Sequence, residues 1–304
     1  MLPLYLEKLS LAELKERAEK LLELQRQCRI CPRECLARRH ENECGDCHST
    51  DEIKIFSVSP HFGEEAPLVG THGSGTIFFS NCNLNCEFCQ NYEISQLGMG
   101  SIVSTEQLAS AMLGLQNRGC HNINLVTPTH FAPQIVQSLV LAVEKGLELP
   151  IVYNCGGYES VETIKLLDGI IDIYMPDIKY SNDHFAEKYS NVKKYWETVT
   201  SAVKEMHNQV GDLKISKRGI AQRGLLIRHL VLPNDLSGSE KVLEFVANEI
   251  SKETYINIMD QYYPAFKALK YSELSRRITQ EEYSKIISYA HQLGLHRGFN
   301  DWAT

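Results

Sequence analysis

Residues 75–89 read GTIFFSNCNLNCEFC, a run of β-branched and aromatic residues that leads directly into three cysteines, Cys82, Cys86 and Cys89. No fourth cysteine or histidine stands beside this CxxxCxxC loop. Three thiolates do not complete a tetrahedral structural zinc site. A four-iron cluster held by three cysteines instead keeps one iron open for an exogenous ligand. We therefore expect a reactive iron–sulfur centre directly after a β-strand.

Further runs of this kind follow, and helix-length amphipathic segments separate them. The strand-like runs occupy residues 75–81, 122–127, 150–154, 170–179, 224–232 and 254–260. The helical segments occupy residues 104–118, 132–145, 159–168, part of 183–209 and about 239–251. Such alternation predicts a parallel sheet covered by helices. Six β/α units are too few for the eight of a closed barrel, so the sequence predicts an α/β fold with a partial, TIM-like (βα)6 barrel.

The N-terminal residues lack this alternation. Apolar residues recur every three to five positions across residues 2–27 with charges between them, which predicts an amphipathic helix that packs on the main domain; a partner-binding helix is the alternative. Residues 28–50 are polar and cysteine-rich without an apolar period, as is typical of a segment folded by a metal. We expect an N-terminal helix and cysteine-rich knuckle (1–50), followed by the partial barrel with a C-terminal helix (51–304).

Composition narrows the function classes. The chain has 304 residues, 43% of them apolar, which is enough for a full hydrophobic core without stapling by disulfides or metal. The formal net charge is −7 and no stretch concentrates Lys and Arg, which argues against nucleic acid as the primary partner. No secretory pattern or apolar run near the ~20 residues of a membrane span is present, so we expect a cytoplasmic protein. Eight of its ten cysteines lie between Cys28 and Cys89, and in a reducing compartment this favours metal binding over disulfides.

The ends of the predicted strands identify the rest of the candidate site, because the chemistry of parallel β/α barrels lies where strands end and helices begin. Polar segments stand there at residues 127–130, 154–158, 176–179 and 260–263. Asp177 and Lys179 lie two positions apart, so their side chains share one face of the strand end. An isolated ion pair is the alternative interpretation.

The loop of residues 82–89 matches the CxxxCxΦC motif of the radical S-adenosylmethionine (SAM) superfamily, with Phe88 at the aromatic position. The resemblance implies that the three cysteines hold a [4Fe–4S] cluster whose open iron binds the amino and carboxylate groups of SAM. An electron, from a donor such as flavodoxin or ferredoxin, then splits SAM to a 5′-deoxyadenosyl radical that abstracts hydrogen from a substrate. The resemblance also implies an oxidoreductase that works under anaerobic conditions. A zinc knuckle completed by a distant residue is the alternative.

Within that superfamily, the chain resembles an uncharacterised branch of homologues of pyruvate formate-lyase activating enzyme. The DIK segment resembles the DLK of glycyl-radical-enzyme activases, which implies that Asp177 and Lys179 line the SAM and substrate pocket as catalytic residues. Arg228, in LIRHLVLP, resembles an activase arginine that contacts SAM, and arginine suits a bidentate grip on a carboxylate. Asn154 and Gly157 resemble the activase TNG turn, where glycine lets the backbone approach the ligand.

Two segments depart from the activase pattern. Activases carry a Gly-Gly-Glu segment after the second strand that receives the SAM amino group, whereas this chain has TPTH at 127–130. We expect Thr129 or His130 to supply the acceptor there, although a histidine at a helix start without ligand role is an equal alternative. After the sixth strand, Tyr262 and Tyr263 stand where an activase carries a histidine, which predicts different substrate contacts.

A second cysteine cluster reads CRICPRECLARRHENECGDC from residue 28 to 47. Its CxxCPxxC…GxC portion resembles the N-terminal segment of the same branch. The resemblance implies a second metal site, with Cys44 as the spare thiol and with these ligands: Cys28, Cys31, Cys35 and Cys47. Spacing does not distinguish zinc or another structural metal from an auxiliary iron–sulfur cluster that relays electrons.

Other residues are expected to be structural. Cys120 and Cys155 stand alone, as buried apolar cysteines do. Glu64 and Glu65, in PHFGEEAP at 60–67, are expected to lie in a solvated acidic loop, with a cap on the pocket as the alternative.

The leading hypothesis is an activase-like enzyme that abstracts hydrogen from a glycyl radical enzyme or a similar protein target. One alternative is radical SAM modification of a small molecule, another peptide or RNA, which the departures from the activase pattern keep open. Another is a non-enzymatic iron–sulfur or zinc protein that binds a partner through residues 2–27 and does not bind SAM.

Overall fold

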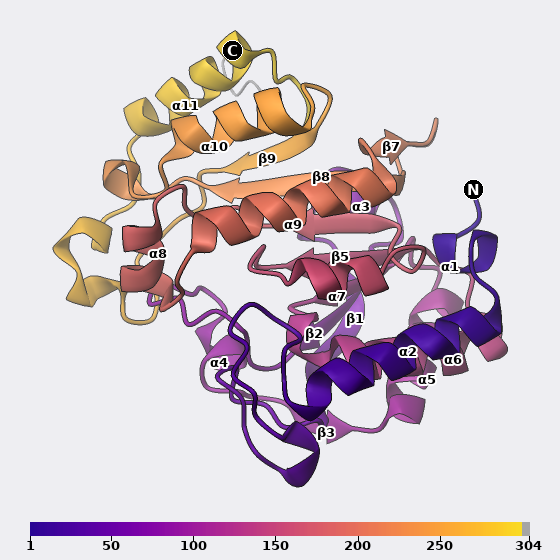
Figure 1. The fold of residues 1–304 in the computed structure, drawn as a ribbon. Helices are drawn as coiled ribbons and strands as arrows, with labels where there is room; N and C mark the ends of the chain where they lie inside the picture. The colour runs from indigo at the N-terminus through magenta and orange to yellow at the C-terminus, as the bar shows by residue number, and fades with distance from the viewer. Residues whose placement is uncertain (300–304) are drawn as a thin grey trace.

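Six parallel strands form the centre of the fold (Figure 1). The computed structural model describes residues 1–299. In spatial order the strands are β2 (Ser74–Phe79), β4 (Ile123–Val126), β5 (Ile151–Cys155), β6 (Ile173–Pro176), β8 (Ala221–Leu230) and β9 (Tyr255–Met259). The partial (βα)6 barrel expected from the sequence is therefore confirmed. All carboxyl ends of these strands point to the same mouth of the barrel, because the strands are parallel.

Helices connect the parallel strands and cover their outer face (Figure 1). They are α5 (Thr105–Asn117), α6 (Ala132–Glu144), α7 (Val161–Leu166), α8 (Asp183–Ser190), α9 (Tyr195–Val210) and α10 (Ser239–Phe245), the last continued by a π-helical turn (Val246–Ile250). The sequence predicted one helix within 183–209, but the structure has two. The break is set by Asn191 and Lys194, whose φ angles of 52° and 50° cannot continue an α-helix.

Antiparallel strands extend the sheet, and the sequence did not predict them. β1 (Ile53–His61) pairs with β2, and β3 (Ser101–Val103) pairs with β1 at the edge of the sheet. The short β7 (Lys214–Ile215) pairs antiparallel with β8. β3 and β7 have only three and two residues, too few for a periodic apolar pattern, which is why they escape a search by periodicity.

The segment after β1 corrects the expectation of a solvated acidic loop. Glu64 lies 3.7 Å from Nη1 of Arg228, and Glu65 accepts a 2.9 Å hydrogen bond from the side chain of Asn257 on β9. Leu68, in the short helix α3 (Ala66–Val69), is fully buried and packs with apolar side chains of β5, β6 and β8. Burial of Leu68 draws the acidic residues into the barrel interior.

The N-terminal part packs on the barrel, as expected. Residues 2–27 form two helices, α1 (Leu4–Glu7) and α2 (Leu11–Arg26), because Ser10 and Glu13 make a capping box that starts α2 afresh. α2 packs against α6 and buries its apolar face, including Leu14 and Leu21. This face and the barrel share one hydrophobic core.

The remaining elements are short, apart from one helix near the C-terminus. They are α4 (Tyr92–Ser95), α11 (Gln280–Leu293) and the 3-10 turns Arg39–Glu41, Thr129–Phe131, Pro233–Asp235, Ala268–Lys270 and Ser272–Leu274. Within residues 1–299, no helix combines the length and the apolar character that a membrane span requires.

Candidate active site

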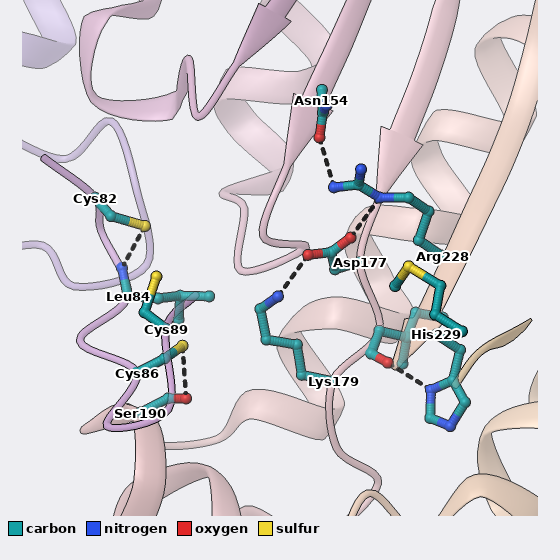
Figure 2. Close-up of polar contacts among 12 residues, drawn as sticks. Cys82, Leu84, Cys86, Cys89, Asn154, Asp177, Lys179, Ser190, Arg228 and His229 are labelled. Atoms are coloured by element: carbon teal, nitrogen blue, oxygen red, sulfur yellow. Dashed lines mark hydrogen bonds and ion pairs between the residues drawn. The ribbon is translucent and has the colours of Figure 1, made fainter. Parts of the chain in front are cut away.

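The catalytic loop (residues 82–89) follows β2 at the barrel mouth. Cys82, Cys86 and Cys89 line one pocket, and Figure 2 shows their sulfur atoms on the same side of it. The pocket has a volume of about 220 Å³. This is several times the ~30 Å³ that a water molecule occupies in the liquid, so the pocket has room for part of a small-molecule ligand.

Each of the three thiols has a hydrogen-bonding neighbour. The backbone N–H of Leu84 donates to the Cys82 sulfur at 3.3 Å, and the Ser190 hydroxyl donates to the Cys86 sulfur at 3.0 Å (Figure 2). The third sulfur lies 3.0 Å from the hydroxyl of Ser95. Donors of this kind favour a thiolate and tune an iron–sulfur cluster. No sequence motif indicated Ser190, because it lies at the end of α8, far along the chain.

A charged network forms the opposite wall of the pocket (Figure 2). Asp177, directly after β6, accepts a bond of 2.5 Å from Nζ of Lys179 and one of 2.8 Å from Nε of Arg228. Arg228, on β8, also donates through Nη2 to the side-chain oxygen of Asn154 at 2.7 Å. The structure thus brings together Asn154, Asp177 and Lys179, identified at two strand ends, and Arg228, identified by its resemblance to an activase segment.

The network is mostly buried, and its charges depend on each other. Burial by itself would raise the pKa of Asp177, but Arg228 and Lys179 hold it below its usual value. Burial would lower the pKa of Lys179, and the carboxylate of Asp177 more than reverses this. All three groups therefore stay charged at neutral pH. Two cations and one carboxylate line the pocket on this side, and Glu64, which lies 3.7 Å from Arg228 without lining the pocket, offsets part of the positive charge.

Phe88 also lines the pocket, and it is buried. Its ring packs edge-on against Tyr180 and Tyr262 at centroid distances of 6.3 and 5.9 Å. These contacts hold the catalytic loop against the barrel. Tyr262 is itself fully buried and donates to the backbone oxygen of Leu274, so it acts as a packing residue here.

The structure does not bring Thr129 to the pocket, which corrects the expectation that it contacts the cofactor. Thr129 is fully buried and donates to the carboxyl group of Glu159 at 2.7 Å. His130 is buried as well, with Nε2 2.8 Å from the backbone oxygen of Ser80. Thr127 lines the pocket instead, with a φ of 59°. This value is rare for a β-branched residue and marks a strained position of the kind found at functional sites.

Gly157 has a different role from the expected one. A Cβ atom there would lie 2.1 Å from the backbone oxygen of Asp177, and its φ is 79°. Glycine is required because the turn packs against Asp177, and the neighbouring Gly156 lines the pocket. Tyr263 is 40% exposed and lies against Arg277, while Gln261 supplies the pocket wall after β9.

The three catalytic-loop thiols fit a cluster better than a single ion. Among residues 1–299, no three carboxylate, imidazole or thiol groups converge to hold one metal ion. Cysteines that bind different irons of one cluster do not need to converge on a point. The donor set is all thiol, each member has a hydrogen-bonding neighbour, and the pocket separates the set from the charged wall, which suits a cluster with one open iron.

The N-terminal thiol set (Cys28, Cys31, Cys35 and Cys47) is distinct from the catalytic loop. Three of its members are buried and Cys35 is half-buried, whereas Cys44 is exposed. All ten cysteines of the chain are free. Cys120 and Cys155 are buried, as expected.

Comparison with known proteins gives the family. A family model described as the radical SAM superfamily matches residues 76–220, from β2 to the start of β8. MJ0674, an uncharacterized protein of Methanocaldococcus jannaschii, is 31% identical over 278 residues, which cover 88% of this chain and 75% of that protein. MJ0808 of the same organism, also uncharacterized, is 25% identical over 311 residues, covering 93% and 86% respectively.

A solved structure adds a fold likeness only. SuiB of Streptococcus suis, bound to its precursor peptide SuiA, has a TM-score of 0.49 at 10% identity, and the match covers 72% of this chain and 46% of SuiB. This chain thus matches less than half of SuiB, and a similarity at that level carries no functional argument. The motif, the pocket, the family model and the long match to MJ0674 agree, and the chain belongs to the radical SAM superfamily.

Proposed function

We propose that this protein cleaves SAM reductively and abstracts hydrogen from a glycyl radical enzyme or a similar protein target, as an activase does. The observation that carries the proposal is a single pocket with three thiols on one wall and the Asp177, Lys179 and Arg228 network on the other. Cys82, Cys86 and Cys89 would hold a [4Fe–4S] cluster, which would supply the electron for SAM cleavage. A reductant such as flavodoxin or ferredoxin would deliver that electron.

The residues of the charged wall have separate roles in this proposal. Lys179 and Arg228 would bind the carboxylate of SAM, because they are the two cations that line the pocket. Arg228 already donates to Asp177 and Asn154, so it also fixes the orientation of these two side chains. Thr127, and not the predicted Thr129, is the pocket-lining residue after β4 in this proposal.

The test is an anaerobic assay of the reconstituted protein with SAM and dithionite. We expect 5′-deoxyadenosine from the wild-type chain and none from Cys86→Ala, whereas the buried cysteine variant Cys120→Ala should match the wild type. With a purified glycyl radical enzyme added, an organic radical signal on that enzyme would support the activase proposal. No 5′-deoxyadenosine from a fully cluster-loaded wild-type chain would overturn it.

A second candidate is modification of a small molecule, another peptide or RNA. It is favoured by Thr127 where activases carry Gly-Gly-Glu, and by Met259 and Gln261 as the pocket wall after β9. Deuterium transfer from labelled candidate substrates into 5′-deoxyadenosine would distinguish it from the activase proposal.

We also propose that the N-terminal thiol set binds zinc or an auxiliary iron–sulfur cluster. Its support is the burial of three of the four thiols in a chain without disulfides. Iron and zinc content per chain in Cys82→Ala would separate the two metals, because residual iron in that variant counts against zinc.

A further inference from the structure

His229 lies next to Arg228 on β8, but its side chain points away from the pocket (Figure 2). Neighbouring side chains of a strand face opposite sides of a sheet, so the ring of His229 lies on the outer, helix-covered side. The ring is fully buried. Its Nδ1 lies 2.6 Å from the backbone oxygen of Ile178, and its Nε2 lies 2.8 Å from the hydroxyl of Ser239, at the start of α10. His229 therefore connects the strand end after β6 to α10.

The partners of the ring determine where its proton lies. A backbone carbonyl only accepts hydrogen bonds, so Nδ1 carries the proton and donates to Ile178. Burial lowers the pKa of His229 to about 4, so the ring is neutral at neutral pH and Nε2 accepts from the hydroxyl of Ser239. The hydroxyl of Ser237, which accepts from the backbone N–H of Leu232, lies 3.0 Å from that of Ser239 and donates to it. These hydrogen bonds run in one direction, and bonds in such a chain strengthen each other.

Ile178, at the end of this chain of hydrogen bonds, lies between the two wall residues Asp177 and Lys179. Its backbone N–H donates to the backbone oxygen of Arg228 at 2.8 Å, and its carbonyl accepts from the imidazole. The backbone N–H of Lys179 donates to the hydroxyl of Tyr195 at 2.8 Å. A peptide group is planar, so bonds to its oxygen and its N–H fix the orientation of the whole group. The directions in which Asp177 and Lys179 leave the backbone depend on these bonds.

The same two segments are joined again at Ser181. Its backbone N–H donates to the backbone oxygen of Ser237 at 3.0 Å, and its hydroxyl donates to the backbone oxygen of Gly238 at 2.9 Å. Residues 178–181 and 237–239 are thus held together by backbone and side-chain bonds, with the imidazole of His229 between them. The position of the strand end after β6 therefore does not depend on the ion pairs of the charged wall alone.

We propose that His229 is a positioning residue for the SAM site, because its Nδ1–H group fixes the carbonyl of Ile178 and thereby the placement of Asp177 and Lys179 in the pocket. Ser239 is a second positioning residue, since its hydroxyl holds the ring in the orientation that this bond requires. Neither residue lines the pocket. The inference rests on the proposed function and deepens it, because it concerns how the chain orients the residues that would bind SAM.

Two amide variants of His229 separate the roles of its ring nitrogens. The amide nitrogen of asparagine lies as many bonds from Cα as Nδ1, and that of glutamine as many as Nε2. His229→Asn can therefore keep the donor to Ile178, whereas His229→Gln keeps only the contact with Ser239. In the reconstituted chain we expect a SAM Kd within about threefold of wild type for His229→Asn and raised about tenfold for His229→Gln, the effect of one hydrogen bond to a buried carbonyl. A Kd in His229→Gln no higher than in His229→Asn would overturn the proposal.

Ser239→Ala tests the orientation of the ring and leaves the imidazole in place. Ser138→Ala is the matched control, because Ser138 is also buried and its hydroxyl donates to the backbone oxygen of Gln134 within α6, away from the pocket. We expect the SAM Kd to rise about threefold in Ser239→Ala and to stay at the wild-type value in Ser138→Ala. Equal Kd values in these two serine variants would overturn the role of Ser239.

A measurement without SAM keeps the inference separate from the proposed function. In urea unfolding of the metal-free chain, Asp177→Asn should lower the midpoint less in the His229→Gln background than in the His229→Asn background, because His229→Gln has already displaced the ion pairs of the wall. Equal losses in the two backgrounds would overturn the inference. If the cluster-loaded wild-type chain cleaves no SAM, the proposed function fails, while the unfolding midpoints still decide the role of His229.

Discussion

Replacing Asp177 with Asn tests whether the charged wall is held by one carboxylate. The carboxylate bonds Lys179 at 2.5 Å and Arg228 at 2.8 Å, and the three side chains are 15–19% exposed. Asparagine keeps the shape but leaves two buried cations without their partner. Breaking a buried ion pair this way costs ~3–5 kcal/mol of unfolding free energy. We expect a loss near the lower end of this range, about 3 kcal/mol, because the side chains are partly exposed and Glu64 lies 3.7 Å from Arg228.

The assay is urea unfolding of the reduced, metal-free chain, followed by circular dichroism. Asp168→Asn is the control, because its carboxylate is 48% exposed and lies 3.9 Å from Lys8. An exposed pair of this kind contributes at most about 1 kcal/mol. Adding Lys179→Met to Asp177→Asn should recover part of the lost stability, since one unpaired cation is removed. Equal losses in Asp177→Asn and Asp168→Asn would refute the reasoning.

Two further predictions concern residues that follow β5, Glu159 and Gly157. Burial raises the pKa of Glu159 from 4.5 to about 7, so the stability it gives the folded chain is complete below pH 4.5 and is lost as pH rises to about 7. The loss of unfolding free energy amounts to about 3 kcal/mol. Glu159→Gln should remove this part of the pH dependence when urea unfolding is compared at pH 5 and pH 8. An unchanged pH dependence in Glu159→Gln would contradict the prediction. Gly157→Ala should cost more than ~3 kcal/mol and weaken SAM binding, because its Cβ would lie 2.1 Å from the backbone oxygen of Asp177. Gly146 has a similar φ of 89° and open space around it, so Gly146→Ala should cost only about 1 kcal/mol of unfolding free energy. Similar losses of stability in the two glycine variants would argue against the close approach at Gly157.

The parallel strands were predictable because each is a local apolar run between two helices. The same logic identified Asn154 and Asp177, since a strand end is a local feature and parallel strands end at one mouth, whereas Arg228 was identified by its resemblance to an activase segment. Acidic residues near β1 were not predictable in this way. Glu64 enters the barrel because Leu68, four positions later, is buried against strands that come much later in the chain.

The sequence predicted Thr129 as the pocket residue after β4, but the structure has Thr127 there, and this error has a different physical cause. Both threonines lie after β4 and have similar chemistry. Which side chain faces the pocket depends on a backbone turn, and the positive φ of Thr127 followed by the 3-10 turn at Thr129 settles it. The sequence TPTH does not predict such a turn, because threonine seldom adopts a positive φ.

The catalytic loop shows why a motif specifies ligands and leaves their geometry to the rest of the chain. Cys86 receives its hydrogen bond from Ser190, which is 104 residues away, and Asn83 is held between Arg33 and Tyr158, 50 and 75 residues away. None of these three partners belongs to the CxxxCxxC pattern. A chain can therefore keep every cysteine of the motif and lose the geometry of its site through a change in the N-terminal segment, in α8 or in the turn after β5.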